Sequence, residues 1–222
     1  MLVPITRSKF EQLIPIVATT AQYKYCWGKL VDFLRRVIIS IAAISIVYVA
    51  LRFLSPDDVE WQAPVPMAIA GLYWWWAPIV LASRRNWETR QFPYSGFWQG
   101  EVLDIYTTEK LISEIETVDK KGKLVVLEDI ETILNLELGD DTGFITEIAV
   151  PLKKAYKSVS RGQIVEMLVM SYRPDLGSFA RVSDVYLPDL NLWLSDYPCV
   201  QRDAFKEVSQ RLGDGNRNYR NR

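Results

Sequence analysis

Histidine is absent from this sequence, and cysteine occurs only twice. Without an imidazole base, the chain cannot use a Ser-His-Asp or Cys-His catalytic arrangement, and the usual histidine-ligated zinc sites are excluded as well. The sequence also contains no phosphate-binding loop, dinucleotide-binding glycine motif, esterase serine motif or C-x-x-C pair. We therefore expect no catalytic residue, no metal site and no cofactor.

Charge is almost missing from two stretches of the N-terminal half. Residues 37–54 carry only Arg52, near the end of the run, and residues 65–82 carry no charge. Runs of this length span roughly 27 Å as helices, close to the hydrocarbon thickness of a bilayer. The first run is apolar on all faces, although a buried core helix is an alternative, and the second could be a re-entrant segment. We predict a transmembrane helical hairpin over residues 35–88, with spans at 37–54 and 65–82 and a kink at Pro78.

The charges that flank the two spans predict their orientation. The connection between them is acidic, whereas the outer flanks are basic. By the positive-inside rule, both termini should lie in the cytoplasm and the connection outside. The acidic residues are Asp57, Asp58 and Glu60, and the basic ones are Lys24, Lys29, Arg35, Arg36, Arg84, Arg85 and Arg90.

Residues 1–34 form an arm before the first span. Four apolar residues share one face of a helix that Pro15 interrupts: Phe10, Leu13, Ile14 and Val17. Aromatic residues alternate with lysines up to Trp27, a composition typical of the headgroup layer. We predict a membrane-surface arm, with a partner-binding arm as the alternative. Cys26 lies here and could be acylated or be an idle thiol; we expect no disulfide with Cys199.

Short strands separated by turns follow from residue 94. The expected strands cover residues 100–106, 111–118, 124–138, 144–152, 163–171 and 180–187, with the most apolar of them, 163–171, at the centre of the sheet. Asp203 could cap a final helix, and residues 213–222 are predicted to be a disordered tail. The fold class expected is an α+β membrane protein: a helical hairpin followed by a small mainly-β barrel or sandwich over residues 94–212 on the cytoplasmic side, resembling an oligonucleotide-binding or SH3-like barrel.

Acidic residues outnumber basic ones in this β-rich segment. Residues 101–212 contain 20 Asp and Glu against 13 Lys and Arg, a net charge of −7. Such a surface repels phosphate backbones and anionic lipids, so we expect no nucleic-acid partner.

Two further patterns have functional and structural interpretations. Carboxylates are paired at Glu128-Asp129, near Glu131, and at Asp140-Asp141. Neighbours on a strand point to opposite faces, and aspartates are common in turns, so we do not expect catalysis from either pair. The sequence Tyr-x-Pro-Asp-Leu, followed by Gly or Asn, occurs at 172–177 and at 186–191. It could form a ligand loop, but two similar strand-ending turns are the simpler interpretation.

Aromatic residues are the candidates for partner binding. Trp74, Trp75 and Trp76 are consecutive within the second span, deeper than the interface that tryptophan prefers. Phe97 and Trp98 follow at the predicted junction between membrane and β segment, where they could instead belong to the β core. We expect one or two of the three tryptophans to contact a pigment, a lipid tail or a partner helix, with simple exposure to lipid as the alternative, and we propose all five side chains as candidate partner contacts.

Three stretches carry a likeness to a known family: Pro93–Tyr106, Leu134–Phe144 and Asp184–Pro198. They resemble uncharacterised membrane proteins of cyanobacteria, thylakoid-bearing organisms, and the likeness extends over nearly the whole chain. Some members of that family carry a phosphate-transporter permease label, which two spans argue against. The resemblance implies a photosynthetic membrane and supplies no catalytic residues.

These observations together favour a non-enzymatic integral membrane protein. We expect a scaffold, assembly factor or accessory subunit of a photosynthetic (thylakoid) membrane complex, with the lipid bilayer and an integral membrane complex, such as a photosystem or other electron-transfer complex, as its partners. It should reside in the thylakoid or cytoplasmic membrane. The alternative is a regulatory or accessory subunit of a membrane transporter. Neither span carries an ionisable residue at mid-depth, which disfavours a transport pathway through the chain itself.

Overall fold

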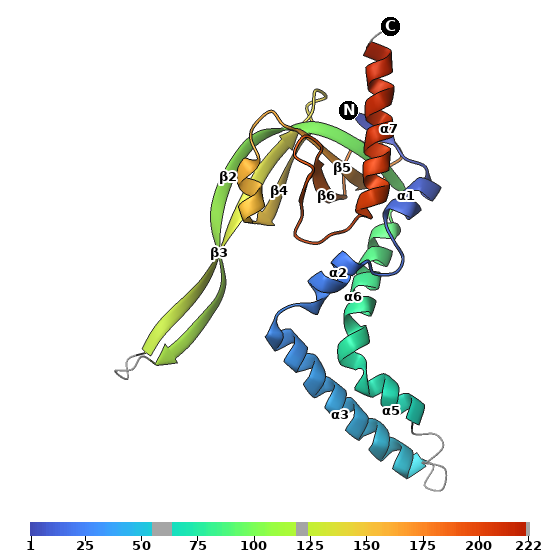
Figure 1. Cartoon of the computed structure of the whole chain (residues 1–222), viewed down its shortest axis with the longest axis vertical. Helices are drawn as coiled ribbons and strands as arrows, with labels where there is room; N and C mark the ends of the chain where they lie inside the picture. The colour runs from blue at the N-terminus through green and yellow to red at the C-terminus, as the bar shows by residue number, and fades with distance from the viewer. Residues whose placement is uncertain (55–63, 119–123, 221–222) are drawn as a thin grey trace. The chain divides into compact units, whose positions relative to one another are not determined.

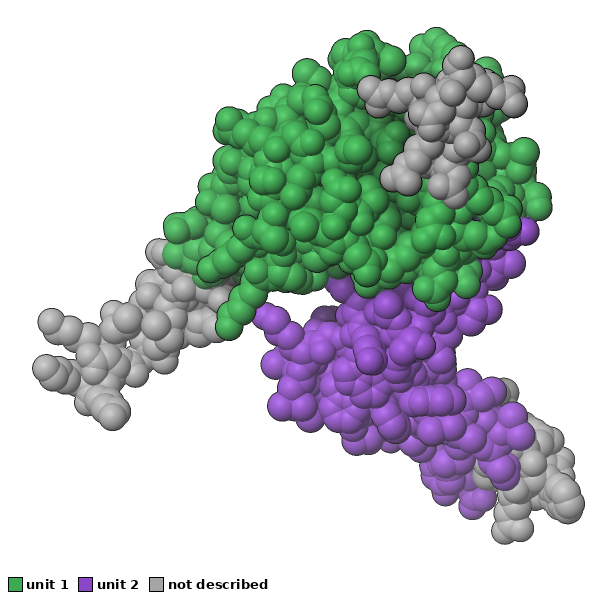
Figure 2. Space-filling model, turned by 45° about the horizontal axis from the view of Figure 1, so that its top comes forward, with its two compact units in different colours: residues 1–10, 92–222 green, residues 11–91 purple. Residues whose placement is uncertain are grey.

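The computed structural model describes residues 1–54, 64–118 and 124–220. The chain forms two compact units, which we treat separately (Figure 2). The sheet unit comprises residues 1–10 and 92–222, and the helical unit comprises residues 11–91. The predicted acidic connection and the predicted turn at 119–123 lie outside the described residues.

The sheet unit is built on one antiparallel sheet of seven strands in the order β4-β3-β2-β5-β6-β7, with β1 paired to β2 beside this path. The strands are β1 (Leu2–Pro4), β2 (Tyr94–Val118), β3 (Leu124–Gly139), β4 (Ile145–Pro151), β5 (Ile164–Ser171), β6 (Arg181–Leu187) and β7 (Leu192–Leu194). A short 3-10 helix, η1 (Lys154–Ser158), follows β4, and α7 (Arg202–Arg220) ends the unit.

The strands expected at 100–106 and 111–118 are one long strand, β2, interrupted by two register shifts against β3. β2 pairs with β5 only up to Glu101, whereas it pairs with β3 as far as Val118. The β2–β3 pair therefore extends as a two-stranded ribbon beyond the other strands (Figure 1). The prediction of β5 as the central strand is confirmed, since β2 and β6 flank it and seven of its eight residues are buried.

Each face of the sheet has its own layer of buried side chains. One face carries the main core, which includes Trp98, Leu136, Met167, Val185 and Leu194. The other face is covered over β5 and β6 by α7 (Figure 1). There the ring of Phe205 contacts those of Phe97, Tyr186 and Trp193. Alternation along the strands thus places neighbouring residues in different layers.

Several predictions for this unit need correction. The sheet is open rather than a closed barrel or a two-sheet sandwich, because β4 and β7 are not joined by strand pairing among the described residues. The final helix is confirmed, but it continues to Arg220 where we expected a disordered tail from residue 213. The arm predicted over residues 1–34 is divided: its first residues form β1 and pair with β2, as Val3 does with Phe97.

The helical unit contains α3 (Leu30–Leu54), α5 (Pro64–Gly71) and α6 (Tyr73–Arg90), preceded by α2 (Thr20–Trp27), while α1 (Arg7–Leu13) begins in the sheet unit. At about 1.5 Å per residue, α3 spans roughly 37 Å, more than the hydrocarbon core of a bilayer. It is long and apolar enough to cross a membrane. The second predicted span, 65–82, is not one straight helix: α5 and α6 meet the same criteria only as a pair, bent by 69°.

A buried amide pair fixes α2 against α6. The side chains of Gln22 and Asn86 are both fully buried, and each donates to the other's carbonyl oxygen at 2.9 Å. Gln22 also accepts from the backbone amide of Thr19, completing the cap of α2. Because buried amides need their hydrogen bonds, this pair gives the arm a defined position on α6.

Candidate partner-binding site in the helical unit

The break between α5 and α6 is the distinctive feature of the helical unit. Leu72 separates the two helices, directly after Gly71. We predicted a kink at Pro78; α6 continues through that residue to Arg90, and a bend of 69° lies between α5 and α6. A proline removes one hydrogen bond from a helix, and the neighbouring bonds can hold the helix together. The bend lies two turns earlier, where glycine weakens the helix.

Close packing against α3 accounts for the glycine at the break. A side-chain carbon added to Gly71 would lie 3.1 Å from Cδ1 of Ile44 on α3. Larger residues at position 71 would therefore push α5 away from α3. Small residues serve the same purpose where helices cross in membranes.

Two side chains bond the backbone groups that the break exposes. The indole Nε1 of Trp76 donates to the carbonyl oxygen of Ile69 at 2.9 Å. The backbone amide of Trp74 donates to Oγ of Ser40 on α3 at 3.2 Å, and Ser40 Oγ donates to the carbonyl of Arg36 at 3.0 Å. Helix ends lack internal partners for such groups. These bonds supply partners for groups that the break leaves without a helical hydrogen bond.

Trp74 belongs to an aromatic cluster with residues of the arm and α3. Its ring contacts Trp27 at 6.1 Å and Phe33 at 5.7 Å, edge to face in both cases. Trp27 and Phe33 stack on each other at 5.7 Å, and Tyr23 contacts Trp27 at 5.5 Å. Such aromatic pairs add to the energy of apolar burial. Trp74 therefore holds three segments of the helical unit together.

Arg36 is the buried cation beside this cluster. It is 8% exposed, and its guanidinium carbon lies 5.5 Å from the centre of the Trp27 ring. Nε donates to the carbonyl of Asp32 at 3.1 Å and Nη2 donates to the carbonyl of Trp27, while Nη1 has no partner among the described residues. The charge lies in the first turns of α3. Burial raises the pKa of the nearby Cys26 thiol, although Arg85 and Arg36 oppose the rise.

Trp75 alone of the three consecutive tryptophans has a largely free ring. It is 52% exposed. It lines an entirely apolar groove of about 610 Å³ inside the bend, together with Val65, Ile69, Leu72 and Trp76. The same side chain borders a second groove of about 340 Å³, next to α2. The three indoles therefore differ in their surroundings. Trp74 packs against other aromatic rings, Trp76 donates a hydrogen bond to the backbone at the break, and Trp75 is exposed on an apolar surface.

Phe97 and Trp98 do not form a surface. Both are fully buried in the sheet unit, Phe97 against Phe205 at 5.3 Å and Trp98 against Phe144 at 5.9 Å. Our proposal of these two residues as partner contacts is therefore corrected, because neither ring is available to another molecule. The two residues are neighbours on β2, so their side chains point to opposite faces of the sheet. Each therefore belongs to a different buried layer.

A family model matches residues 3–218 of the chain. The chain belongs to DUF8619. The family is described as one of unknown function, so membership of DUF8619 assigns no activity. No curated protein and no solved structure matches the chain significantly.

Asp140, one of the paired carboxylates in this DUF8619 chain, holds a turn in the sheet unit. Asp140 accepts from the indole Nε1 of Trp98 at 2.7 Å and from the amide of Thr142 at 2.9 Å, and so fixes the turn before β4. Burial raises the pKa of Asp140, but these hydrogen bonds outweigh it and lower the pKa overall. The side chains of Glu128 and Asp129 lie outside the described residues.

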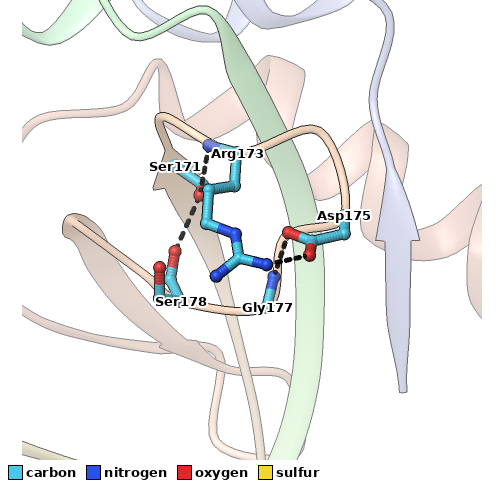
Figure 3. Close-up of polar contacts among 5 residues, drawn as sticks. All are labelled: Ser171, Arg173, Asp175, Gly177 and Ser178. Atoms are coloured by element: carbon cyan, nitrogen blue, oxygen red, sulfur yellow. Dashed lines mark hydrogen bonds and ion pairs between the residues drawn. The ribbon is translucent and has the colours of Figure 1, made fainter.

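The repeated Tyr-x-Pro-Asp-Leu sequence forms two turns with different backbones. In the first, Arg173 donates to Asp175 at 2.6 Å, and Asp175 accepts from the amide of Gly177 at 3.0 Å (Figure 3). The left-handed residue there is Leu176, with φ of 52°, rather than Gly177. In the second turn the left-handed residue is Asn191, with φ of 48°. Both copies are closed by their own side chains, which supports the structural interpretation of the repeat.

The residues that sequence reasoning missed are the polar ones around the helices. Ser40, Gln22 and Asn86 each bond across two segments, and Arg36 is buried rather than free in the headgroup layer. The only signal in the sequence is a polar residue on an otherwise apolar helix, as at Ser40. Partners across the unit cannot be read from such a signal alone.

Proposed function

We propose that this protein is a membrane-anchored scaffold or accessory subunit that binds an integral membrane partner at the bend between α5 and α6. The observation that carries the proposal is Trp75, a half-exposed indole on an apolar groove of about 610 Å³. A groove without polar lining suits the aliphatic side chains of a partner helix. Large aromatic residues at the centre of an interface commonly contribute most of its binding energy.

The membrane arrangement is part of the proposal. α3 crosses the bilayer once, and the bent pair α5–α6 returns, so that both termini lie on the cytoplasmic side. The basic residues that flank both segments favour this orientation. The sheet unit, with its acidic surface, then faces the cytoplasm and takes no part in binding nucleic acid.

The resemblance to cyanobacterial membrane proteins favours a thylakoid complex as the partner, and no step of the proposal requires catalysis. The alternative, an accessory subunit of a transporter, draws on the broken helix, since discontinuous helices often form transport sites. However, the groove has no polar or charged group that could bind a solute. A photosynthetic or other electron-transfer complex is therefore our first choice.

Site-specific photocross-linking tests the proposed surface. A benzophenone amino acid replaces Trp75 in one variant and Trp87 in the control. Trp87 also lies on α6 and is 62% exposed, but it follows the apolar part of the helix. We expect a discrete cross-linked membrane protein from position 75 and none from position 87. Mass spectrometry then identifies the partner, and photosystem or solute-permease subunits distinguish the two candidates. Equal cross-linking from both positions, or lipid alone at position 75, would contradict the proposed function.

Labelling from the two sides of the membrane tests the topology. In a variant without Cys26 and Cys199, single cysteines replace Ser55 or Ser178. A membrane-impermeant maleimide should reach residue 55 from outside and residue 178 only from the cytoplasmic side. Labelling of both from the same side would rule out the two-span hairpin.

A further inference from the structure

One edge of β2 is open along the middle of the strand. On this side β2 pairs with β5 only as far as Glu101, and Val102 then bonds to the two residues before β5. The opposite edge of β2 pairs with β3 as far as Val118. Residues 106–112 are all exposed, whereas a strand covered on one face shows alternating burial. Beyond Val102, this edge of β2 therefore has no partner strand among the described residues.

Hydrogen bonds on the far side of β3 show which backbone groups of β2 face the open edge. The carbonyl of Thr132 accepts from the amide of Leu152, just after β4, at 2.9 Å, so Thr132 faces away from β2. Opposite residues of an antiparallel pair either exchange both hydrogen bonds or exchange none. Glu109 is opposite Thr132 and therefore directs its N–H and C=O away from β3. Thr107 and Leu111 do the same, because the direction alternates along a strand.

The open stretch of the edge has a limit at each end. At the inner end, Oδ1 of Asp104 accepts from the amide of Ile105 at 2.6 Å and from the guanidinium of Arg161. At the outer end, a register shift directly after Leu111 marks a bulge. Charged side chains and bulges are devices that protect sheet edges from further pairing. Between these limits, the outward N–H and C=O groups of residues 107–111 have no backbone partner among the described residues, and they match one short added strand.

The charge of the β2–β3 ribbon favours a basic occupant over a second copy of the chain. Residues 103–118 and 124–133 contain seven Asp and Glu against one Lys. An antiparallel second copy can use Thr107, Glu109 and Leu111 together only in the register centred on Glu109. That register places two glutamates directly opposite each other, which is destabilising. A lysine or arginine opposite Glu109 gives a favourable cross-strand pair instead.

Two further features favour an added strand at this place. Leu111 and its cross-strand neighbour Ile130 are 47% and 49% exposed, so they offer apolar contact to one residue of the occupant. A two-stranded ribbon alone is at best marginally stable in water, and a third strand supplies the missing pairing on one side.

We propose that residues 107–111 of β2 bind a basic, extended segment of another protein as an added strand of the sheet. The segment bonds to the outward backbone groups of Thr107, Glu109 and Leu111. It places a lysine or arginine opposite Glu109 and an apolar residue opposite Leu111. In this mode of recognition, main-chain bonds supply affinity and side chains supply specificity. The site lies within the sheet unit and does not depend on the surface proposed at the bend between α5 and α6.

Hydrogen exchange of the full-length protein in uncharged detergent micelles tests the site. The probe is the peptide acetyl-Val-Thr-Lys-Thr-Val-amide. At saturation it should slow the exchange of the Thr107, Glu109 and Leu111 amides at least tenfold. The amides of Thr108 and Lys110, which face β3, should exchange as before. A peptide with glutamate in place of lysine should bind at least tenfold more weakly. A peptide N-methylated at its lysine and both valines should give no protection, because it lacks the N–H groups that an added strand donates.

Two variants test the role of charge in choosing the occupant. Glu109→Lys changes an exposed side chain and should reverse the preference, so that the glutamate peptide binds at least tenfold tighter than the lysine peptide. Glu101→Lys is the matched control, since β2 already pairs on both sides at that residue, and it should keep the wild-type preference. An unchanged preference in Glu109→Lys contradicts the proposal.

Three results with the wild-type protein also overturn the proposal. Equal binding of the N-methylated peptide means that charge alone attracts the probe. Equal binding of the lysine and glutamate peptides means that the edge does not select a basic segment. Protection of Thr107, Glu109 and Leu111 without any peptide, rising with protein concentration, identifies a second copy as the occupant.

Discussion

Replacing Trp76 with phenylalanine removes one hydrogen-bond donor from the break between α5 and α6. The indole Nε1 of Trp76 donates to the carbonyl of Ile69, which lies in the last turn of α5. In the membrane arrangement that we propose, this carbonyl would then face lipid with no partner. An unsatisfied buried carbonyl costs about 1–3 kcal/mol, and apolar surroundings favour the upper part of that range. We therefore expect a loss of about 2 kcal/mol in the local stability of the bend.

Hydrogen exchange of the full-length protein in micelles measures this loss directly. The amides of Trp75 and Trp76 bond to the carbonyl of Leu72 at 2.9 and 3.2 Å, so their exchange reports opening of the first turn of α6. A loss of about 2 kcal/mol corresponds to roughly 30-fold faster exchange.

Trp75→Phe is the matched control for this experiment. It removes the same atoms from the neighbouring residue, whose indole donates no hydrogen bond among the described residues. Exchange in Trp75→Phe should stay within about threefold of the wild type, since an exposed site changes stability by only about 0.5 kcal/mol. If the two variants exchange equally fast, Trp76 fills space rather than repairing the break, and our reasoning about the bend fails.

Three further predictions concern buried polar groups and close packing. Gln22→Leu or Asn86→Leu alone should each destabilise the helical unit by about 2 kcal/mol, because each leaves the amide side chain of its partner without this hydrogen bond. The double variant should cost less than the two single losses added together, although it also loses the bond from the Thr19 amide to Gln22; thermal unfolding of the three variants checks this. At Gly100 an added side-chain carbon would lie 2.2 Å from the indole of Trp98, so Gly100→Ala should lower the free energy of unfolding by about 3 kcal/mol. At Gly143 no atom lies within 4 Å, but φ is 83°, so Gly143→Ala should lower it by only about 1 kcal/mol. Denaturant titration measures both losses. Burial raises the pKa of Asp184 to about 6 in the folded protein, so folding favours its protonated form and stability falls as pH rises from 4 to 7. We expect the free energy of unfolding to fall by roughly 3 kcal/mol over this range in the wild type and not in Asp184→Asn. Equal pH dependence of the wild type and Asp184→Asn would contradict this prediction.

Much of the sheet could be predicted because its pattern is local. Alternation marked β3 and β4 to within two residues, and the apolar run at 163–171 identified the central strand β5. Turn residues set the ends of these strands. Closure into a barrel could not be predicted, since it depends on whether β4 and β7 reach pairing distance, and nothing local to either strand determines that.

The helical unit shows where local rules fail. The rule for proline placed a kink at Pro78, but the helix bends at Leu72, where Ser40 on α3 and the indole of Trp76 can accept and donate the freed hydrogen bonds. Likewise, the three tryptophans look alike in sequence, and only their neighbours in space separate the packing residue from the exposed Trp75. Partners from distant segments decide both outcomes.

The position of β1 has a consequence for biosynthesis. Residues 2–4 pair with residues 96–98. The strand β1 therefore cannot pair until the ribosome has synthesised β2, which follows the whole helical unit in the sequence. Chains emerge N-terminal end first, and domains generally fold as units in that order. Here the helical unit is an insertion within the sheet unit, and it leaves the ribosome complete before β2 exists. The helical unit is therefore synthesised in full before the sheet can be completed, and a fragment that starts at residue 94 lacks the strand β1 that pairs with β2.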